Sequence, residues 1–263
     1  MISGLGYTEE MGADQERAAS LRAYYRQLMA TWGPQDWWPA YTRFEVIAGA
    51  FLTQNTAWTN VERALRSLRD AGALNPDSIR RMPLSKLARM IRSSGYFRQK
   101  AQRLKNFVRH VDARYGGSLD RMFAQPTAKL REELLALNGV GPETADSILL
   151  YAGGHPVFVV DAYTRRIFER HGVITAQAKY EEIRRLVEQA FDDGMPAGGD
   201  QPPTSPLAER RRHKFVIRRA APAARAFDEF HALLVQAAKH HCLKAKAQCA
   251  RCPLERFLAE GSC

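Results

Sequence analysis

Through most of its length the chain carries apolar residues at the three- and four-residue spacing of α-helices, and this spacing most constrains its fold. One example runs through Val61, Ala64, Leu65 and Leu68, which would share one face of a helix. Glycines and prolines interrupt the spacing at short intervals, as turn signals do. We therefore expect an all-α protein with short connections. The one strand-like stretch, residues 157–160, suits equally well a buried extended segment that leads into a helix.

The chain is strongly basic. Its 263 residues contain 39 Lys and Arg against 28 Asp and Glu, which gives a formal net charge of +11. Such an excess favours an anionic partner, and nucleic acid is the expected one. The sequence lacks a long uncharged apolar run, and it begins without the basic and apolar regions of a secretory signal. We expect one or two domains, no membrane association, and a cytoplasmic, nucleoid-associated monomer.

Residues 194–225 depart from the rest of the chain in composition. They hold five of the 13 prolines and seven basic residues against two acidic ones. This composition predicts a loosely held insertion between two helices. Its arginine-rich run, residues 210–219, could bind phosphates or could be a solvated linker.

A tight hairpin is predicted at residues 137–145, where Leu-Asn-Gly-Val-Gly-Pro-Glu-Thr-Ala joins two apolar helical stretches. The two glycines permit positive φ angles, and the proline suits the first turn of the second helix. Backbone N–H groups at such a helix start can bind a phosphate without reading sequence, although a Gly-x-Gly pattern alone is more often only a turn. The candidate DNA-binding residues in the hairpin are Leu137, Gly139, Val140, Gly141 and Thr144.

Asp161 comes twenty residues after Gly141 and directly follows the apolar stretch 157–160. A carboxylate at this place would stand at the start of a helix, where it could serve as an N-cap. It could also be a catalytic carboxylate beside bound nucleic acid. The local sequence leaves both roles open.

All four cysteines lie in the last 22 residues, at Cys242, Cys249, Cys252 and Cys263. A disulfide scaffold needs more cysteines at this chain length, and structural thiols are usually scattered. The clustering therefore predicts a metal site.

Together these motifs resemble the helix-hairpin-helix, Gly/Pro-loop, Asp superfamily of DNA base-excision glycosylases. The hairpin is followed in order by Gly-Gly-His-Pro at 153–156, by Val-Val-Asp at 159–161 and by Arg166. The general plan is similar to endonuclease III, and finer features are closer to the bacterial 3-methyladenine DNA glycosylase III group. Those features are Trp-Trp-Pro at 37–39, Leu-Thr-Gln-Asn-Thr at 52–56, the segment 94–101 and Gly-Pro-Glu-Thr-Ala-Asp at 141–146.

The resemblance implies a two-domain helix-hairpin-helix glycosylase fold with a C-terminal iron–sulfur cluster loop. One domain, residues 41–151, would be a six-helix barrel that contains the hairpin. The other would join residues 1–40 to residues 152–263, and DNA with its target base would lie between the two. The insertion has no counterpart in this plan.

The resemblance also implies a monofunctional DNA glycosylase that hydrolyses the N-glycosidic bond of alkylated purines, such as 3-methyladenine, in double-stranded DNA. Asp161 would stabilise the positive charge that develops at the sugar C1′ and orient or deprotonate the attacking water. Glu143 stands where bifunctional relatives carry a lysine, and a carboxylate cannot form their Schiff base. AP lyase activity is therefore not expected.

Aromatic residues would line the base pocket, where a cationic base over a tryptophan face is stabilised by about 0.5–2 kcal/mol. Gln54 would fill the gap that the extruded base leaves in the duplex. The plainer alternatives are core packing for the tryptophans and a solvated first-turn acid for Glu143. The implied pocket residues are Trp37, Trp38, Trp58 and Glu143, and the further DNA contacts are Gln54 and Arg166.

Three other functions stay open at this point. The same scaffold could remove mispaired uracil or thymine, or an oxidised base. It could bind lesions without catalysis, although the intact Asp161 counts against that. It could also be a bifunctional lyase that uses another lysine.

The spacing of the first three cysteines matches the iron–sulfur loop of endonuclease III, so the resemblance implies a [4Fe–4S] cluster. Its ligands would be Cys242, Cys249, Cys252 and Cys263. The last interval is longer than in the family, and four thiolates could instead hold zinc. The bound cluster would fix a basic loop against DNA phosphates.

Overall fold

The structure, a computed structural model, describes residues 5–35, 38, 40–192 and 220–258. Contacts divide these residues into two compact units. Unit 1 contains residues 5–35, 156–192 and 221–258, and unit 2 contains residues 38 and 40–155 together with Ala220. Regular structure in the described ranges is helical throughout, which confirms the all-α prediction.

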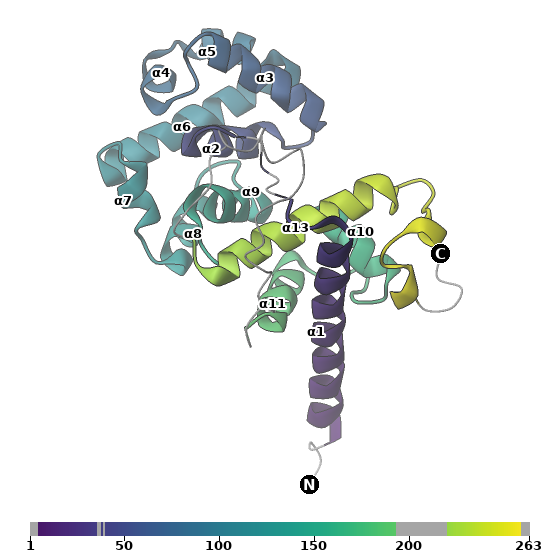
Figure 1. The fold of residues 1–263 in the computed structure, drawn as a ribbon. Coiled ribbons are helices and arrows are strands. Elements are labelled where there is room, and N and C mark those ends of the chain that lie inside the picture. Colours follow the sequence, from purple (N-terminus) through teal and green to yellow (C-terminus); the bar gives the residue numbers. More distant parts are fainter. Residues whose placement is uncertain (1–4, 36–37, 39, 193–219, 259–263) are drawn as a thin grey trace. The chain divides into compact units, whose positions relative to one another are not determined.

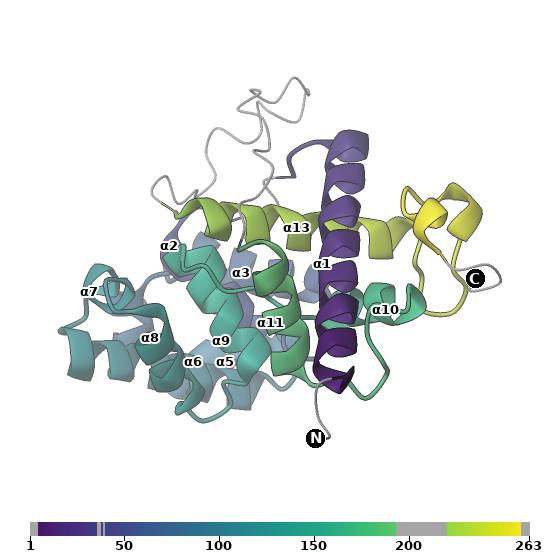
Figure 2. The same ribbon diagram turned by 90° about the horizontal axis from the view of Figure 1, so that it is seen from below.

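Unit 1 is built around two long helices, α1 (Leu5–Trp32) and α13 (Pro222–His240), which pack against each other (Figure 1). Helix α11 (Tyr180–Ala190) packs on α1, and α10 (Ala162–Arg170) packs on α13 (Figure 2). Two short 3-10 helices, η3 (Cys249–Arg251) and η4 (Glu255–Phe257), follow α13. Phe230 of α13 lies at the centre of an aromatic core that also contains Tyr25, Phe158, Phe168 and Phe191.

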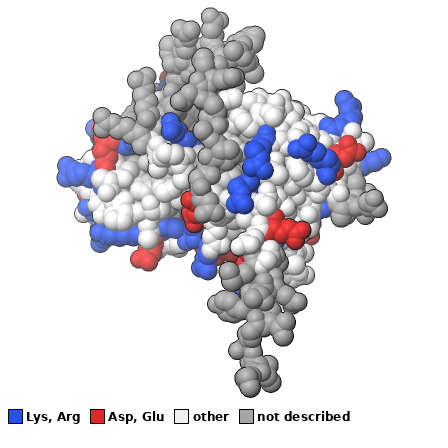
Figure 3. Space-filling view, turned by 60° about the horizontal axis from the view of Figure 1, so that its bottom comes forward, with Lys and Arg blue, Asp and Glu red and all other residues white. Residues whose placement is uncertain are grey.

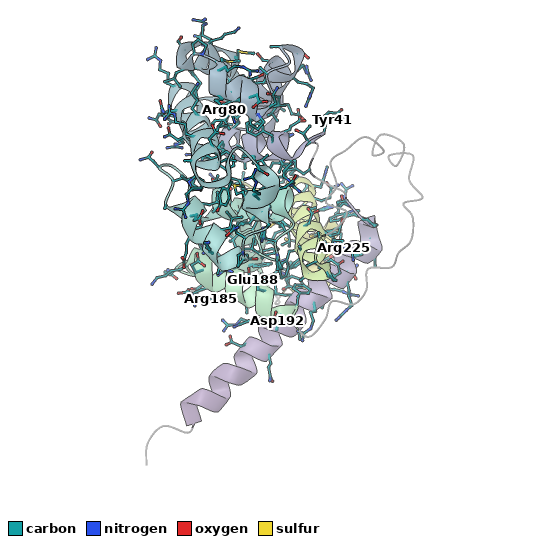
Figure 4. The ribbon with its side chains drawn as sticks, turned by 90° about the vertical axis from the view of Figure 1, so that its left-hand side faces the viewer. Tyr41, Arg80, Arg185, Glu188, Asp192 and Arg225 are labelled. Atoms are coloured by element: carbon teal, nitrogen blue, oxygen red, sulfur yellow. The ribbon has the colours of Figure 1, made fainter. Side chains whose placement is uncertain are left out.

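Residues 157–160 form a buried extended segment and not a strand. The backbone N–H of Phe158 donates to Glu188 Oε1 at 2.9 Å, and Glu188, labelled in Figure 4, belongs to α11. A side chain thus satisfies a buried backbone group for which a strand would need a sheet partner. Of the two structures that the sequence left open here, the extended segment leading into a helix is the one observed.

Unit 2 has α2 (Arg43–Leu52) at its centre. Every residue of this helix from Phe44 to Leu52 is buried, and it packs against α3, α6, α9 and η2. The other elements are α3 (Trp58–Asp70), α4 (Pro76–Arg81), α5 (Leu84–Met90), η1 (Arg92–Ser94), α6 (Phe97–Tyr115), α7 (Leu119–Phe123), α8 (Thr127–Leu135), α9 (Pro142–Ser147) and the π-helix η2 (Ile148–Gly153).

Lys100 of α6 is buried in unit 2, with 1% of its surface exposed. Its Nζ donates to the carbonyl of Leu52 at 2.8 Å and to that of Ser94 at 2.6 Å. These are the last residues of α2 and η1, whose end carbonyls have no partner within their own helices. Burial, and then the charge of Arg103, lower the pKa of Lys100 to about 8. One side chain therefore joins the ends of two helices to a third.

The predicted C-terminal boundary of the insertion at 194–225 was wrong, because a helix begins before residue 225. Pro222 begins α13, so residues 222–225 are helical. A proline suits this first position because its φ is already helical and its missing N–H would have no intrahelical partner. The rest of the segment up to residue 219, including the arginine-rich run, lies outside the described residues.

The surface carries charges of both signs. Lys and Arg side chains are spread over the face shown in Figure 3, with Asp and Glu side chains between them. Within the described ranges, no helix combines the length and the apolar character needed to cross a membrane.

Candidate active site and nucleic-acid interface

The hairpin between α8 and α9 closes with a hydrogen bond of 3.0 Å from Val140 N to Leu137 O. Gly139 has a φ of +80°, which a residue with a side chain rarely adopts. Gly141 has an ordinary φ of −91°, so only one of the two glycines needs the left-handed conformation. A Cβ at Gly141 would have no neighbour within 4 Å, so the backbone there is open to close approach by another molecule. Pro142 occupies the first turn of α9, as predicted.

Gln54 contacts the hairpin through its side-chain amide. Its Nε2 donates to Gly139 O at 3.0 Å and to Thr144 Oγ1 at 2.9 Å. Its Oε1 accepts from Arg103 Nη1 at 2.6 Å. Arg103 also covers Gly139, since a Cβ there would lie 2.0 Å from Arg103 Nε. In this structure Gln54 is therefore part of a clamp that holds the hairpin.

Two of the tryptophans lie together in unit 2. The rings of Trp38 and Trp58 meet edge to face, with centroids 5.5 Å apart, and Trp38 lies tilted against Tyr151 at 4.7 Å. Trp38 also covers Gly49, where a Cβ would come within 3.1 Å of its ring. Both tryptophans are half-buried, and Trp58 Nε1 donates to Glu62 at 2.9 Å. The arrangement has one packed side and leaves aromatic surface accessible. Trp37 lies outside the described residues.

Glu143 is exposed in the first turn of α9. This position agrees with the plainer of its two expected roles, a solvated acid that the helix dipole favours.

Asp161 begins α10 in unit 1 as its N-cap, so the expected helix start is observed. Its Oδ1 accepts from the backbone N–H of Thr164 at 2.8 Å. Its Oδ2 lies 3.5 Å from His231 Nε2, on α13. The Asp161 side chain keeps 15% of its surface exposed, so solvent or substrate can still reach the carboxylate.

The environment of Asp161 favours its ionised form. Burial raises the pKa of the carboxyl group, but the charge of His231 and hydrogen bonds from His231 and Thr164 lower it further, and the pKa lies below its usual range. The N-cap role and an ionised, partly accessible carboxylate are therefore compatible at one residue.

The cysteine loop follows α13. Cys242 is buried, Cys249 begins η3, and Cys252 closes that turn with a backbone hydrogen bond of 2.8 Å to Cys249 O. Burial raises the pKa of the Cys252 thiol, and the neighbouring Cys242 contributes to the rise. Cys263 lies outside the described residues. Among the described ones, no group of three or more His, Cys, Asp or Glu is arranged to hold a metal ion.

Two arginines of α10 bind the cysteine loop. Arg166 Nε donates to Cys242 O at 2.7 Å. Arg170 Nη1 donates to Cys242 Sγ at 3.2 Å and to Leu243 O at 2.8 Å. Arg166, expected at the DNA, thus holds the loop in this structure.

The chain matches the HhH-GPD superfamily of base excision DNA repair proteins over residues 48–192, more than half of its length. The chain belongs to this superfamily. As an HhH-GPD protein it is a DNA glycosylase of base excision repair. It is 40% identical over 234 residues to the protein MJ1434 of Methanocaldococcus jannaschii, which is named as a DNA repair glycosylase, with 89% of this chain and 93% of that protein covered.

Two further comparisons concern glycosylases with different named substrates. This HhH-GPD chain superimposes on the crystal structure of the H. pylori 3-methyladenine DNA glycosylase MagIII bound to 1,N6-ethenoadenine with a TM-score of 0.64 and 29% identity, covering 86% of this chain and 97% of that one. It is 26% identical over 243 residues to a thymine-DNA glycosylase of Aeropyrum pernix, with 92% and 94% of the two chains covered.

Sequence reasoning about this glycosylase missed several residues that contact its candidate site residues. They are Arg103, Tyr151, Arg170 and His231. Each is far in sequence from the residue that it contacts, and none belongs to a local motif that could have singled it out.

Proposed function

We propose that this glycosylase is monofunctional and hydrolyses the N-glycosidic bond of alkylated purines in duplex DNA, with Asp161 as its catalytic carboxylate. Alkylation at a ring nitrogen gives the purine a positive charge and makes it a better leaving group. Such a base needs an electron-rich aromatic surface for binding and one carboxylate for the developing sugar cation.

The observation that carries the proposal is the aromatic cluster of Trp38, Trp58 and Tyr151. Its packed side fixes the Trp38 ring, while both tryptophans keep accessible surface. A fixed ring loses little conformational entropy when a base stacks on it. The ethenoadenine bound to the H. pylori enzyme, a purine with a modified ring, is consistent with this substrate class.

Glu143 and Lys100 support the monofunctional assignment. Glu143 has no amine with which to attack a sugar, and it is exposed in the first turn of α9. Lys100 has a pKa lowered to about 8, but its Nζ is buried on two carbonyls and cannot reach a substrate.

The test incubates purified protein with duplexes that each carry one lesion. Each reaction is then divided into two samples, one treated with alkali and one left untreated. We expect 1,N6-ethenoadenine or methylated purines to give strand cleavage only after alkali, and borohydride to trap no covalent complex. Product from a G·T or G·U mispair alone would replace the substrate class with the second candidate, which the thymine-DNA glycosylase relative favours. DNA binding without any product would leave a lesion-binding protein.

A Glu143→Lys variant is expected to gain covalent trapping by borohydride, because it restores an amine at the position that bifunctional relatives use. Trapping should rise from none to a readily detected fraction of the protein. The matched control is Glu132→Lys, which adds the same charge on α8. Trapping of the wild-type protein would overturn the monofunctional assignment.

We further propose that the cysteine loop holds a [4Fe–4S] cluster with Cys242, Cys249 and Cys252 among its ligands. Thiolates are the ligands of such clusters, Cys242 and Cys252 are free thiols among the described residues, and Arg170 places a positive charge on Cys242 Sγ. Cys249 is disulfide-bonded in this structure, so it would join the ligand set only after reduction to the thiol. The cluster would have a structural role, holding the loop between its cysteines.

Protein purified without oxygen should contain about four iron atoms per chain, with acid-labile sulfide and broad visible absorption. Cys249→Ser should lose most of the iron and lower the unfolding temperature, whereas Lys244→Met, on the same loop, should retain both. Stoichiometric zinc without iron would contradict the cluster, and a full iron content in Cys263→Ser would remove Cys263 from the ligand set.

A further inference from the structure

The geometry points to His231 as a positioning residue that keeps the Asp161 carboxylate ionised and fixed in orientation. The inference rests on the proposed function, in which Asp161 carries the chemistry. His231 lies on α13, seventy residues from Asp161 in sequence, and no motif in the chain indicates it.

The two oxygens of Asp161 have different partners. Oδ1 accepts the Thr164 backbone N–H at 2.8 Å, as an N-cap does, and Oδ2 lies 3.5 Å from His231 Nε2. A cap alone would leave the carboxylate free to turn about its hydrogen bond. Because the His231 imidazole contacts the second oxygen, both oxygens have a fixed partner and the carboxylate is held in one orientation.

His231 is itself held in place. Its side chain is 4% exposed, and its ring meets Phe158 edge to face, with centroids 6.2 Å apart. Phe158 is anchored by its backbone hydrogen bond to Glu188. The packing of α10 against α13 then brings the imidazole to the start of α10. A buried histidine on a helix commonly serves only as packing, and the decisive difference here is the nitrogen directed at a carboxylate that is partly accessible.

Other charged or titratable groups near this pair come from two elements, α11 and α13. Glu188 and Tyr180 of α11 bond the backbone of Phe158 and Val160, and Asp228 lies one turn before His231 on α13. Among all of these, His231 is the group whose charge lowers the pKa of Asp161 against the effect of burial.

Without His231, only the hydrogen bonds from Thr164 would oppose the rise in the pKa of Asp161 that burial causes. The fraction of ionised Asp161 would begin to fall at a higher pH, and a protonated carboxyl group cannot stabilise a cation on the sugar. The consequence is a pH-dependent loss of rate, which distinguishes this role from packing.

The experiment measures single-turnover excision of a methylated purine from acid to neutral pH for the wild type, His231→Leu and His231→Gln. At the acid end of the pH–rate profile, which we call the acid limb, the excision rate falls as pH is lowered. We expect the acid limb of His231→Leu to lie about one pH unit higher than that of the wild type, and its excision rate at neutral pH to fall about tenfold. His231→Gln, which retains a donor, should recover most of the neutral rate. Phe230→Leu, on the same helix, should lower the unfolding temperature without moving the acid limb.

A direct titration keeps the inference testable if no excision is found. The Asp161 carboxyl carbon, followed by NMR in full-length protein, should titrate at higher pH in His231→Leu and His231→Gln than in the wild type. Identical titration curves, or superimposable acid limbs, would overturn the role of His231. An Asp161→Asn variant that excises at the wild-type rate would instead overturn the proposed function and leave the titration result standing.

Discussion

Asp161→Asn should bind duplex DNA as the wild type does but release its target base at least about 100- to 1,000-fold more slowly, because a neutral amide cannot offset the charge that develops on the sugar. Asparagine caps helices as well as aspartate does, so the hydrogen bond from Thr164 and the stability of α10 should be kept. The two roles of Asp161, cap and carboxylate, are thereby separated in one variant.

The measurement is single-turnover excision together with thermal unfolding. Asp161→Ala serves as the companion variant, since it loses both the charge and the cap and should be about 1 kcal/mol less stable than Asp161→Asn. If Asp161→Asn excises bases within a few fold of the wild-type rate, Asp161 is an N-cap only and the chemistry must come from another residue.

Lys100→Met should lower the free energy of unfolding by about 2–4 kcal/mol. Methionine fills the volume but donates no hydrogen bond, so the carbonyls of Leu52 and Ser94 would lose their buried partner. The measurement is chemical denaturation at neutral pH. Lys105→Met is the matched control on the same helix, because Lys105 donates to Arg80 O at an exposed site and should cost less than about 1 kcal/mol.

The same lysine predicts how stability depends on pH. Its pKa is lowered from 10.5 to about 8 in the folded protein, so between these values the unfolded state binds more protons and the stability of the folded state rises with pH. The neutral amine still donates to both carbonyls. Above pH 10 the raised pKa values of Tyr24 and Tyr25, each about 12, act in the opposite direction. Lys100→Met should lack the rise between about pH 8 and 10, and an equal rise in that variant would contradict the assignment.

Much of the secondary structure could be predicted from the sequence because it depends on near neighbours. The apolar spacing at Val61, Ala64, Leu65 and Leu68 places all four residues on the buried face of α3. Pro142 begins a helix for a steric reason that needs only its own ring. The end of the expected insertion was wrong for the same local reason, since Pro222 starts α13 and does not break the chain there.

The pairings around the candidate site could not be predicted in this way. Lys100 carries a charge, which on sequence alone predicts an exposed side chain, and its burial became possible only because the ends of α2 and η1 supply two carbonyls. The sequence likewise contains Gln54 as part of a recognisable motif, but its contacts with Arg103 and the hairpin arise from the packing of separate helices.

The sequence by itself determined the helical class, the hairpin, the position of Asp161 at a helix start and the superfamily, because turns, caps and apolar periodicity are set by residues a few positions apart. Only the tertiary structure decided what each of these residues contacts: Tyr151 beside Trp38, Arg170 on Cys242, His231 on Asp161. Those contacts join residues seventy or more positions apart in the sequence, and their energy comes from burial and hydrogen bonds that exist only once the helices have packed.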